Sequence, residues 1–174
     1  MGTDTAFVVL GISLLGGMMG ILCGGIVADQ LHRLVSYGRL AAMSIGMGCT
    51  VPVALMSIYL EVGVLFYLAS WLTMFFITWY HGPMAAVIDD MAADDRAATA
   101  QAVVIFTMHL LGTAPSSWIV GEVADEYGLR QAMLIPTGGV LVAAIVLIGG
   151  WRTMEDDWAR AHASSEIAPE HHKK

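Results

Sequence analysis

The stretch Gly25-Ile26-Val27-Ala28-Asp29-Gln30-Leu31-His32-Arg33 ends the first of five long apolar segments in the sequence. Its glycine, its acid and its base are four residues apart. On a helix, this spacing places Gly25, Asp29 and Arg33 on neighbouring turns of one face. The stretch therefore predicts a small contact surface directly below a charge pair, at the end of an apolar helix.

Apolar segments without charge make up most of the chain. Of its 174 residues, 57% are hydrophobic and 13% are charged, and the mean hydropathy is +0.69. The segments without Asp, Glu, Lys or Arg cover residues 6–28, 40–60, 62–88, 97–121 and 131–151. Each is long enough to cross a bilayer, where a central charge costs about 2.5 to 3.5 kcal/mol. The sequence predicts an all-α bundle of five transmembrane helices over residues 1–151 and a polar cytoplasmic tail over residues 152–174.

Short connections are predicted between these segments. Glu61 forms a one-residue turn, and residues 122–130 form an outer loop between the fourth and fifth segments. The tail mixes acids, His, Ser and Ala, which predicts at most a short interfacial helix followed by disorder.

Basic residues divide unevenly between the two sides that the segments define. Arg130 alone lies on one side, whereas the other side receives Arg33, Arg39, Arg96, Arg152, Arg160, Lys173 and Lys174. Because cytoplasmic loops carry the excess of Lys and Arg, the basic side is predicted to be cytoplasmic. The sequence thus predicts an integral protein of a plasma or bacterial inner membrane, with Met1 outside and Lys174 inside.

The cysteines and the net charge do not indicate a cofactor. Cys23 and Cys49 both fall inside apolar segments, so a disulfide framework is not expected. The net charge of -7 comes from acids in the loops and the tail, where they are solvated. We expect membrane lipid and a small-molecule substrate as partners, and no metal, cofactor or nucleic acid.

Small residues gather on one side of the first segment, and glycine and proline interrupt the fourth segment. The first side is formed by Ser13, Gly16, Gly17, Gly20, Cys23 and Gly24. Such a face lets another helix backbone approach closely, which predicts a packing surface. Packing positions are also predicted at Gly112, Pro115 and Gly121 of the fourth segment, where Pro115 bends or loosens the helix.

Polar side chains form stripes on the third and fourth segments. The third segment aligns Tyr67, Trp71, Met74, Thr78, His81, Gly82, Ala85 and Asp89, and the fourth aligns Gln101, His109, Gly112 and Ser116. Intramembrane polar groups usually face a bundle interior or a water-filled cavity. The candidates for a substrate path are therefore Trp71, Thr78, His81, Asp89, Gln101 and His109. Trp and Thr also serve as ordinary helix contacts, and a single His is often a packing residue.

Three motifs resemble the C-terminal half of the major facilitator superfamily of transporters. The spacing of Gly25, Asp29 and Arg33 resembles its cytoplasmic loop signature. Residues 82–90 with residues 96–100 resemble the junction between the tenth and eleventh helices, particularly in the Spinster-like branch. Residues 111–115, with Gly121 and Asp125, are similar to the eleventh helix and its outer loop. Aligned in this way, the five segments correspond to helices eight to twelve.

The resemblance implies one part of a secondary active transporter, with the N-terminal bundle or a second half supplied from outside this chain. Such proteins work by alternating access, here with coupling to protons or another gradient. The implied substrate is a small organic or amphipathic, lipid-like solute, since Spinster-like relatives take lysolipids and sphingoid lipids. The implied conformational latch comprises Gly25, Asp29, Arg33 and Arg96, and the implied proton-coupling residues are His81 and Asp89.

Two other functions are compatible with parts of the sequence. The aspartates of residues 89–95 could hold Mg²⁺ and a diphosphate, but intramembrane enzymes of that kind need a second, facing cluster. The sequence has no such partner cluster, so we do not expect an enzyme. A non-transporting membrane scaffold remains the alternative to a transporter part.

Overall fold

The computed structural model describes residues 3–92 and 96–167, and within these ranges every regular element is helical. The elements are α1 (Thr3–His32), α2 (Gly38–Tyr59), α3 (Val64–Ile77), the 3-10 turn η1 (Thr78–Tyr80), α4 (His81–Met91), α5 (Ala97–Met108), the π-helical turn η2 (His109–Thr113), α6 (Ala114–Tyr127), α7 (Leu129–Ala132) and α8 (Leu134–Ile167). The all-α prediction is confirmed for the described part of the chain.

These elements join into five helices that are long and apolar enough to cross a membrane. The five spans are Thr5–His32, Gly38–Tyr59, Val64–Met91, Ala97–Tyr127 and Leu129–Trp151. Their number is that of the predicted segments, and they are compatible with an integral membrane protein.

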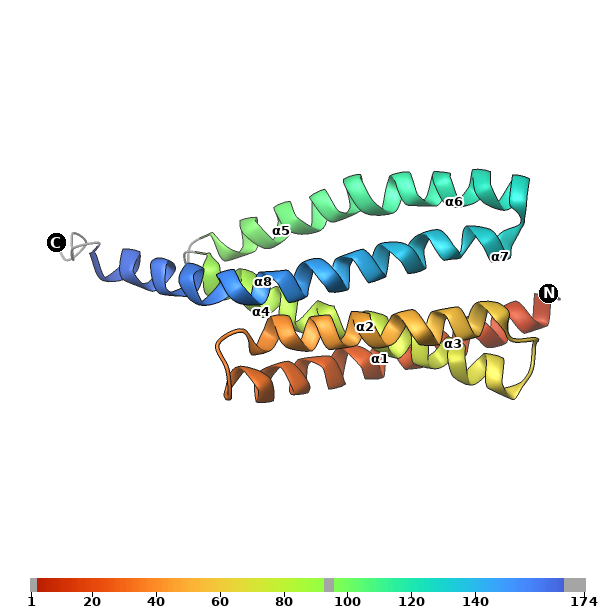
Figure 1. Ribbon diagram of the computed structural model, residues 1–174, viewed down its shortest axis with the longest axis horizontal. Coiled ribbons are helices and arrows are strands. Elements are labelled where there is room, and N and C mark those ends of the chain that lie inside the picture. The colour runs from red at the N-terminus through yellow and green to blue at the C-terminus, as the bar shows by residue number, and fades with distance from the viewer. Residues whose placement is uncertain (1–2, 93–95, 168–174) are drawn as a thin grey trace.

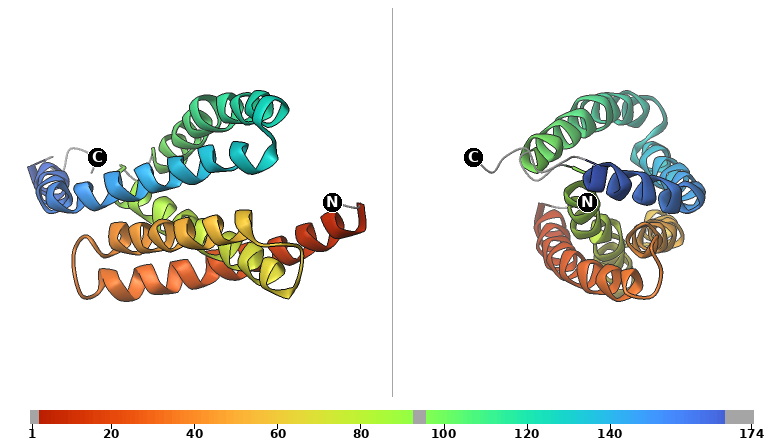
Figure 2. Two further views of the ribbon diagram at one scale, coloured as in Figure 1. Left: turned by 45° about the vertical axis from the view of Figure 1, so that its right-hand side comes forward. Right: turned by 90° about the vertical axis from the view of Figure 1, so that its left-hand side faces the viewer.

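The spans run back and forth along one axis (Figure 1). The α2–α3 and α6–α7 connections lie at one end of the molecule, and the α1–α2 connection lies at the other. Helices α1, α2 and α3 pack against one another, and α2 packs along α8. The α5–α6 span stands on the far side of α4 and α8 from α1 (Figure 2). The bundle is therefore compact around α2 and loose around α5–α6.

Small residues form the buried core. The buried apolar side chains are Ala28, Ala41, Ala42, Met43, Ala54, Ala69, Ala132 and Ala144. Ser44 and Thr50 are also buried, and each hydroxyl donates to the carbonyl four residues earlier, at 2.8 Å. Because lipid tails are as apolar as leucine, burial of large side chains adds little in a membrane. Close packing of small residues takes its place.

Helix α1 meets α3 and η1 through its glycine face. A Cβ atom built on Gly16 would lie 2.6 Å from the Trp71 carbonyl oxygen, and one on Gly24 would lie 2.6 Å from Trp79 Cα. At Gly20 the distance to the Phe75 carbonyl oxygen would be 2.0 Å. Side chains of any size are therefore excluded along this contact. Gly112 and Gly121 have no atom within 4 Å of such a Cβ, so the structure does not bring these two into a helix contact.

Two helices extend beyond their predicted ends. The outer loop expected over residues 122–130 is helical as far as Tyr127, and Gly128 then turns the chain with φ of 89°. Helix α8 continues past Trp151 to Ile167, so the prediction of a short helix after residue 151 is wrong. Residues 152–167 contain no glycine or proline to stop a helix. The disorder expected further on concerns residues 168–174, which lie outside the described ranges.

One connection is longer than predicted. Glu61 is not a one-residue turn, because α2 ends at Tyr59 and α3 begins at Val64. Near this connection, the Arg130 guanidinium lies 5.7 Å from the centre of the Tyr59 ring, which links α7 to the end of α2.

Candidate functional site

A cleft of about 270 Å³ opens between α4 and α5. Its lining residues are His81, Met84, Ala85, Ile88, Gln101, Ile105, Met108 and His109. Three predicted path residues, His81, Gln101 and His109, therefore come together on two facing helices. Most of the remaining wall is aliphatic or thioether, so the cleft combines a few polar groups with an apolar body, as ligand pockets commonly do.

Irregular helical turns adjoin both histidines of the cleft. Pro83 has no N–H for the carbonyl of Trp79, four residues earlier, and the chain forms the 3-10 turn η1 there before His81 begins α4. Pro115 likewise has no N–H for the Leu111 carbonyl, and the π turn η2 lies there, with Ala114 N–H donating to the His109 carbonyl. Turns of both kinds are frequent at hinges and functional sites.

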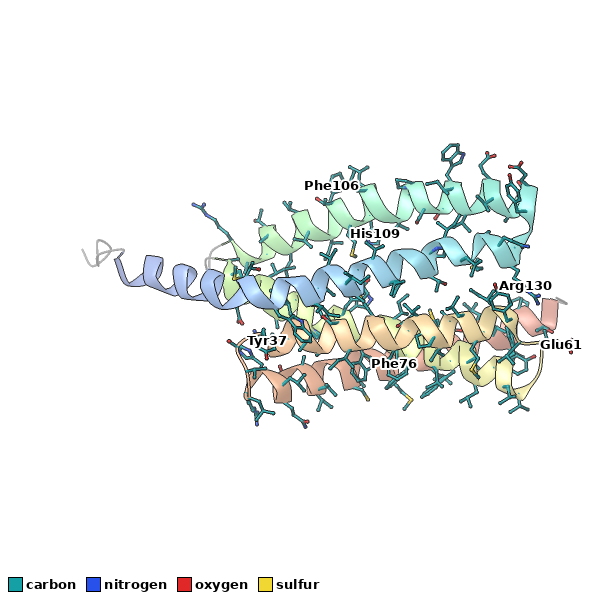
Figure 3. All side chains as sticks on the ribbon, in the orientation of Figure 1. Tyr37, Glu61, Phe76, Phe106, His109 and Arg130 are labelled. Atoms are coloured by element: carbon teal, nitrogen blue, oxygen red, sulfur yellow. The ribbon has the colours of Figure 1, made fainter. Side chains whose placement is uncertain are left out.

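Figure 3 shows how the α5–α6 span divides its side chains. His109 projects toward the rest of the molecule, whereas Phe106 projects outward and is 66% exposed. The His109 Nδ1 atom lies 3.1 Å from the Thr113 hydroxyl, which orients the imidazole ring within η2.

Two neighbouring aspartates at the end of α4 connect this helix to two others. Gln101 Nε2 donates to Asp89 Oδ1 at 2.7 Å, which joins α5 to α4. Asp90 forms an ion pair with Arg39 of α2, and the Arg39 guanidinium also lies 3.4 Å from the Ala86 carbonyl oxygen. The Arg39 side chain is 17% exposed and that of Asp90 is 38% exposed, so the pair is partly shielded from solvent. Together these contacts join the end of α4 to both α5 and α2.

Helix α8 is held to the same end of the bundle by Trp151. Its indole ring stacks on Tyr37 with 5.4 Å between ring centres. The indole N–H donates to the Ser44 hydroxyl at 3.2 Å, and Ser44 is buried in α2. Trp151 therefore fixes α8 against α2 through one stacked and one hydrogen-bonded contact.

The predicted polar stripe of the third segment divides between two environments. Trp71 and Thr78 lie in the α1–α3 contact, where Thr78 Oγ1 is 3.0 Å from the Gly17 carbonyl oxygen and 2.9 Å from that of Met74. His81 and Ala85 line the cleft, and Asp89 lies beside its Gln101 end. The structure thus gives Trp71 and Thr78 the surroundings of helix contacts.

Three of the four predicted latch residues, Gly25, Asp29 and Arg33, lie at the end of α1. Gly25 packs on α4, since a Cβ on Gly82 would lie 3.4 Å from Gly25 Cα. Asp29 lies in the last turns of α1, and both Asp29 and Arg33 are exposed. No ion pair joins Asp29 to Arg33 in the described structure. Arg96 immediately precedes the first residue of α5.

Several residues of this site were not singled out from the sequence. Met84 and Met108 line the cleft, Arg39 pairs with Asp90 of α4, and Trp151 fixes α8 to α2. Met84 could have been predicted from the sequence, because it follows His81 by three residues and therefore lies on the same helix face. Contacts such as Arg39 with Asp90 join residues 51 positions apart, and no local pattern indicates them.

Metal ligands do not gather in the described part of the chain. Within residues 3–92 and 96–167, no group of three or more His, Cys, Asp or Glu side chains is placed to hold a metal ion. Asp94 and Asp95 of the aspartate-rich stretch lie outside these ranges.

Comparison with known proteins provides no family assignment. No protein-family model matches the chain, and no curated protein or solved structure matches it significantly. Function is therefore inferred from the site and from the sequence motifs.

Proposed function

We propose that this chain is part of a secondary active transporter related to the major facilitator superfamily, with the α4–α5 cleft on its substrate path. The observation that carries the proposal is the cleft itself, because His81, Gln101 and His109 all line it and each of its two helices adjoins an irregular turn. Polar groups inside a membrane mark substrate and ion pathways. The order of the three sequence motifs supports the same assignment.

The α5–α6 span supports the proposal that further helices complete the molecule. None of its described residues is buried, whereas α2 buries eight. Two large apolar side chains of this span, Leu111 and Trp118, are 71% and 69% exposed. The same span also carries the polar residues Ser116 and His109. We infer that the N-terminal bundle, or a second half, packs on part of this surface and completes the path.

In this proposal, the exposed carboxylate of Asp29 is the latch. A helix N-terminus of the other bundle would stabilise that charge by about 0.3 to 1 kcal/mol in one conformational state. Gly25 and Arg33 lie one turn before and one turn after this acid at the end of α1, and Arg96 precedes the helix N-terminus that would receive the corresponding acid from the other bundle. His81 and Asp89 are the proposed proton-coupling groups.

A cysteine in the cleft should react with water-soluble thiol reagents. In the transporter with Cys23 and Cys49 replaced by alanine, we expect a charged methanethiosulfonate to label Met108→Cys, which lines the cleft. Phe106→Cys is the matched control, because Phe106 is two residues away and points outward. Labelling of the control at the same rate, or no labelling of Met108→Cys, would contradict a water-filled path.

Orientation in the membrane follows from the basic residues and has its own test. Glu61 and Arg130 lie at one end of the molecule and Tyr37 at the other (Figure 3). We expect Glu61→Cys to react with an impermeant maleimide in intact cells, because the less basic end faces outward. Val35→Cys, next to Ser36 and Tyr37, should react only after permeabilisation. The reverse result would invert the proposed topology.

A further inference from the structure

The cleft between α4 and α5 has different chemistry along its length. His109 and Gln101 are eight residues apart on one span, so its polar groups are separated by about 12 Å along the helix axis. The stretch between them is lined by Met84, Ala85, Ile88, Ile105 and Met108. None of the described residues that line the cleft is a lysine or an arginine. A ligand that fits the cleft therefore has an apolar body. The residues at the Gln101 end determine which charge the ligand can carry.

Gln101 lines that end of the cleft, and the exposed Asp89 carboxylate lies beside it as an acceptor with negative charge. One amide N–H of Gln101 is directed to Asp89 Oδ1, which leaves the Gln101 carbonyl oxygen and the second Asp89 oxygen as acceptors. Arg39 forms its ion pair with Asp90, so the nearest basic side chain of α2 is engaged by the neighbouring acid. An ammonium group has three N–H donors and a positive charge, and it complements this arrangement.

We propose that the cleft selects organic ammonium ions with a short apolar body, and rejects carboxylates of the same size. This inference rests on the proposed function, because it names the class of substrate that the path would take. The ammonium group donates to the second Asp89 carboxylate oxygen and to the Gln101 carbonyl oxygen, beside the hydrogen bond that joins the two side chains. The apolar body lies along the Met84 and Met108 thioethers, which are flexible and polarisable and adapt to rings or chains. The volume of about 270 Å³ accommodates at least about nine water-sized groups.

Three probes of matched size test this selectivity: phenethylammonium, 2-phenylethanol and phenylacetate. Each is titrated into the full chain in phosphatidylcholine nanodiscs at pH 7, and the signal of empty nanodiscs is subtracted. Because the Asp89 carboxylate attracts the ammonium group and repels a carboxylate, we expect phenethylammonium to bind about tenfold more tightly than phenylacetate. Equal binding, or tighter binding of phenylacetate, would overturn the proposal.

Asp89→Asn should reduce the preference for the ammonium probe to less than about threefold, since the charge is removed while the shape is kept. Asp125→Asn is the control, because Asp125 is an exposed acid near the opposite end of the same span as Gln101. Unchanged binding of 2-phenylethanol to Asp89→Asn shows that the cleft is still folded. An unaltered ammonium preference in that folded variant would overturn the assignment of Asp89.

These binding measurements need neither a gradient nor a second bundle, so they separate the two proposals. One outcome is that the chain prefers the ammonium probe but the complete transporter shows no gradient-driven uptake of amines or other solutes. This outcome contradicts the transport function and supports the binding site. Gradient-driven uptake of carboxylates, with no ammonium preference in the nanodisc assay, supports transport and overturns the site.

Discussion

Replacing Gly20 with alanine is expected to disrupt the contact between α1 and α3. The added methyl group would lie 2.0 Å from the Phe75 carbonyl oxygen and 2.3 Å from the Thr78 hydroxyl. The first neighbour is backbone and cannot rotate away, so the helices must separate. Overpacking of this kind costs about 1 to 3 kcal/mol. We expect a lower apparent Tm for the purified chain in detergent, measured by circular dichroism.

Gly11→Ala is the matched control for this variant. Gly11 lies on the same helix, and a Cβ atom there meets nothing within 4 Å. Alanine favours a helix over glycine by about 1 kcal/mol, so this variant should be as stable as the parent or more stable. If Gly20→Ala had the stability of Gly11→Ala, the close approach of α1 and α3 would be contradicted.

Replacing His81 with glutamine is expected to remove most of the pH dependence of uptake by the complete transporter. Imidazole is the side chain that changes charge between pH 5 and 8 at its unperturbed pKa, whereas glutamine hydrogen-bonds without titrating. If His81 carries the coupled proton, uptake by His81→Gln should vary less than about twofold across this range. Initial rates in proteoliposomes at fixed membrane potential provide the measurement.

His32→Gln is the control, because His32 ends α1 and does not line the cleft. It should keep the pH profile of the parent. A His81→Gln protein that retains the full profile, even at lower abundance, would assign His81 to packing and would reject the coupling role.

The number of spans followed directly from the sequence, whereas their internal breaks did not. Charge-free segments are decisive because lipid offers a charge no solvation, and all five are helices in the structure. Pro83 and Pro115 indicated bends. Whether a proline gives a kink, a 3-10 turn or a π turn depends on neighbouring helices, which a local pattern does not contain.

The candidate site was predicted in part for a similar reason. His81, Gln101 and His109 stood out because polar groups in an apolar segment need partners, and the structure places all three at one cleft. Trp71 and Thr78 satisfied the same criterion and lie instead against the glycines of α1. Periodicity assigns a residue to a face of its helix, but only tertiary packing determines what that face meets.

The glycine face of α1 has a consequence for how this bundle can change shape. Ordering glycine removes no side-chain rotamers, so the α1 half of this interface loses no side-chain entropy when it forms. At Gly16, Gly20 and Gly24, α1 has no side chain that would have to move past the facing residues for α1 to shift along α3. Because nothing larger than hydrogen fits at Gly20, this freedom of movement depends on the absence of a single methyl group. The glycine face therefore favours sliding of α1 along α3, and the same face tolerates substitution poorly.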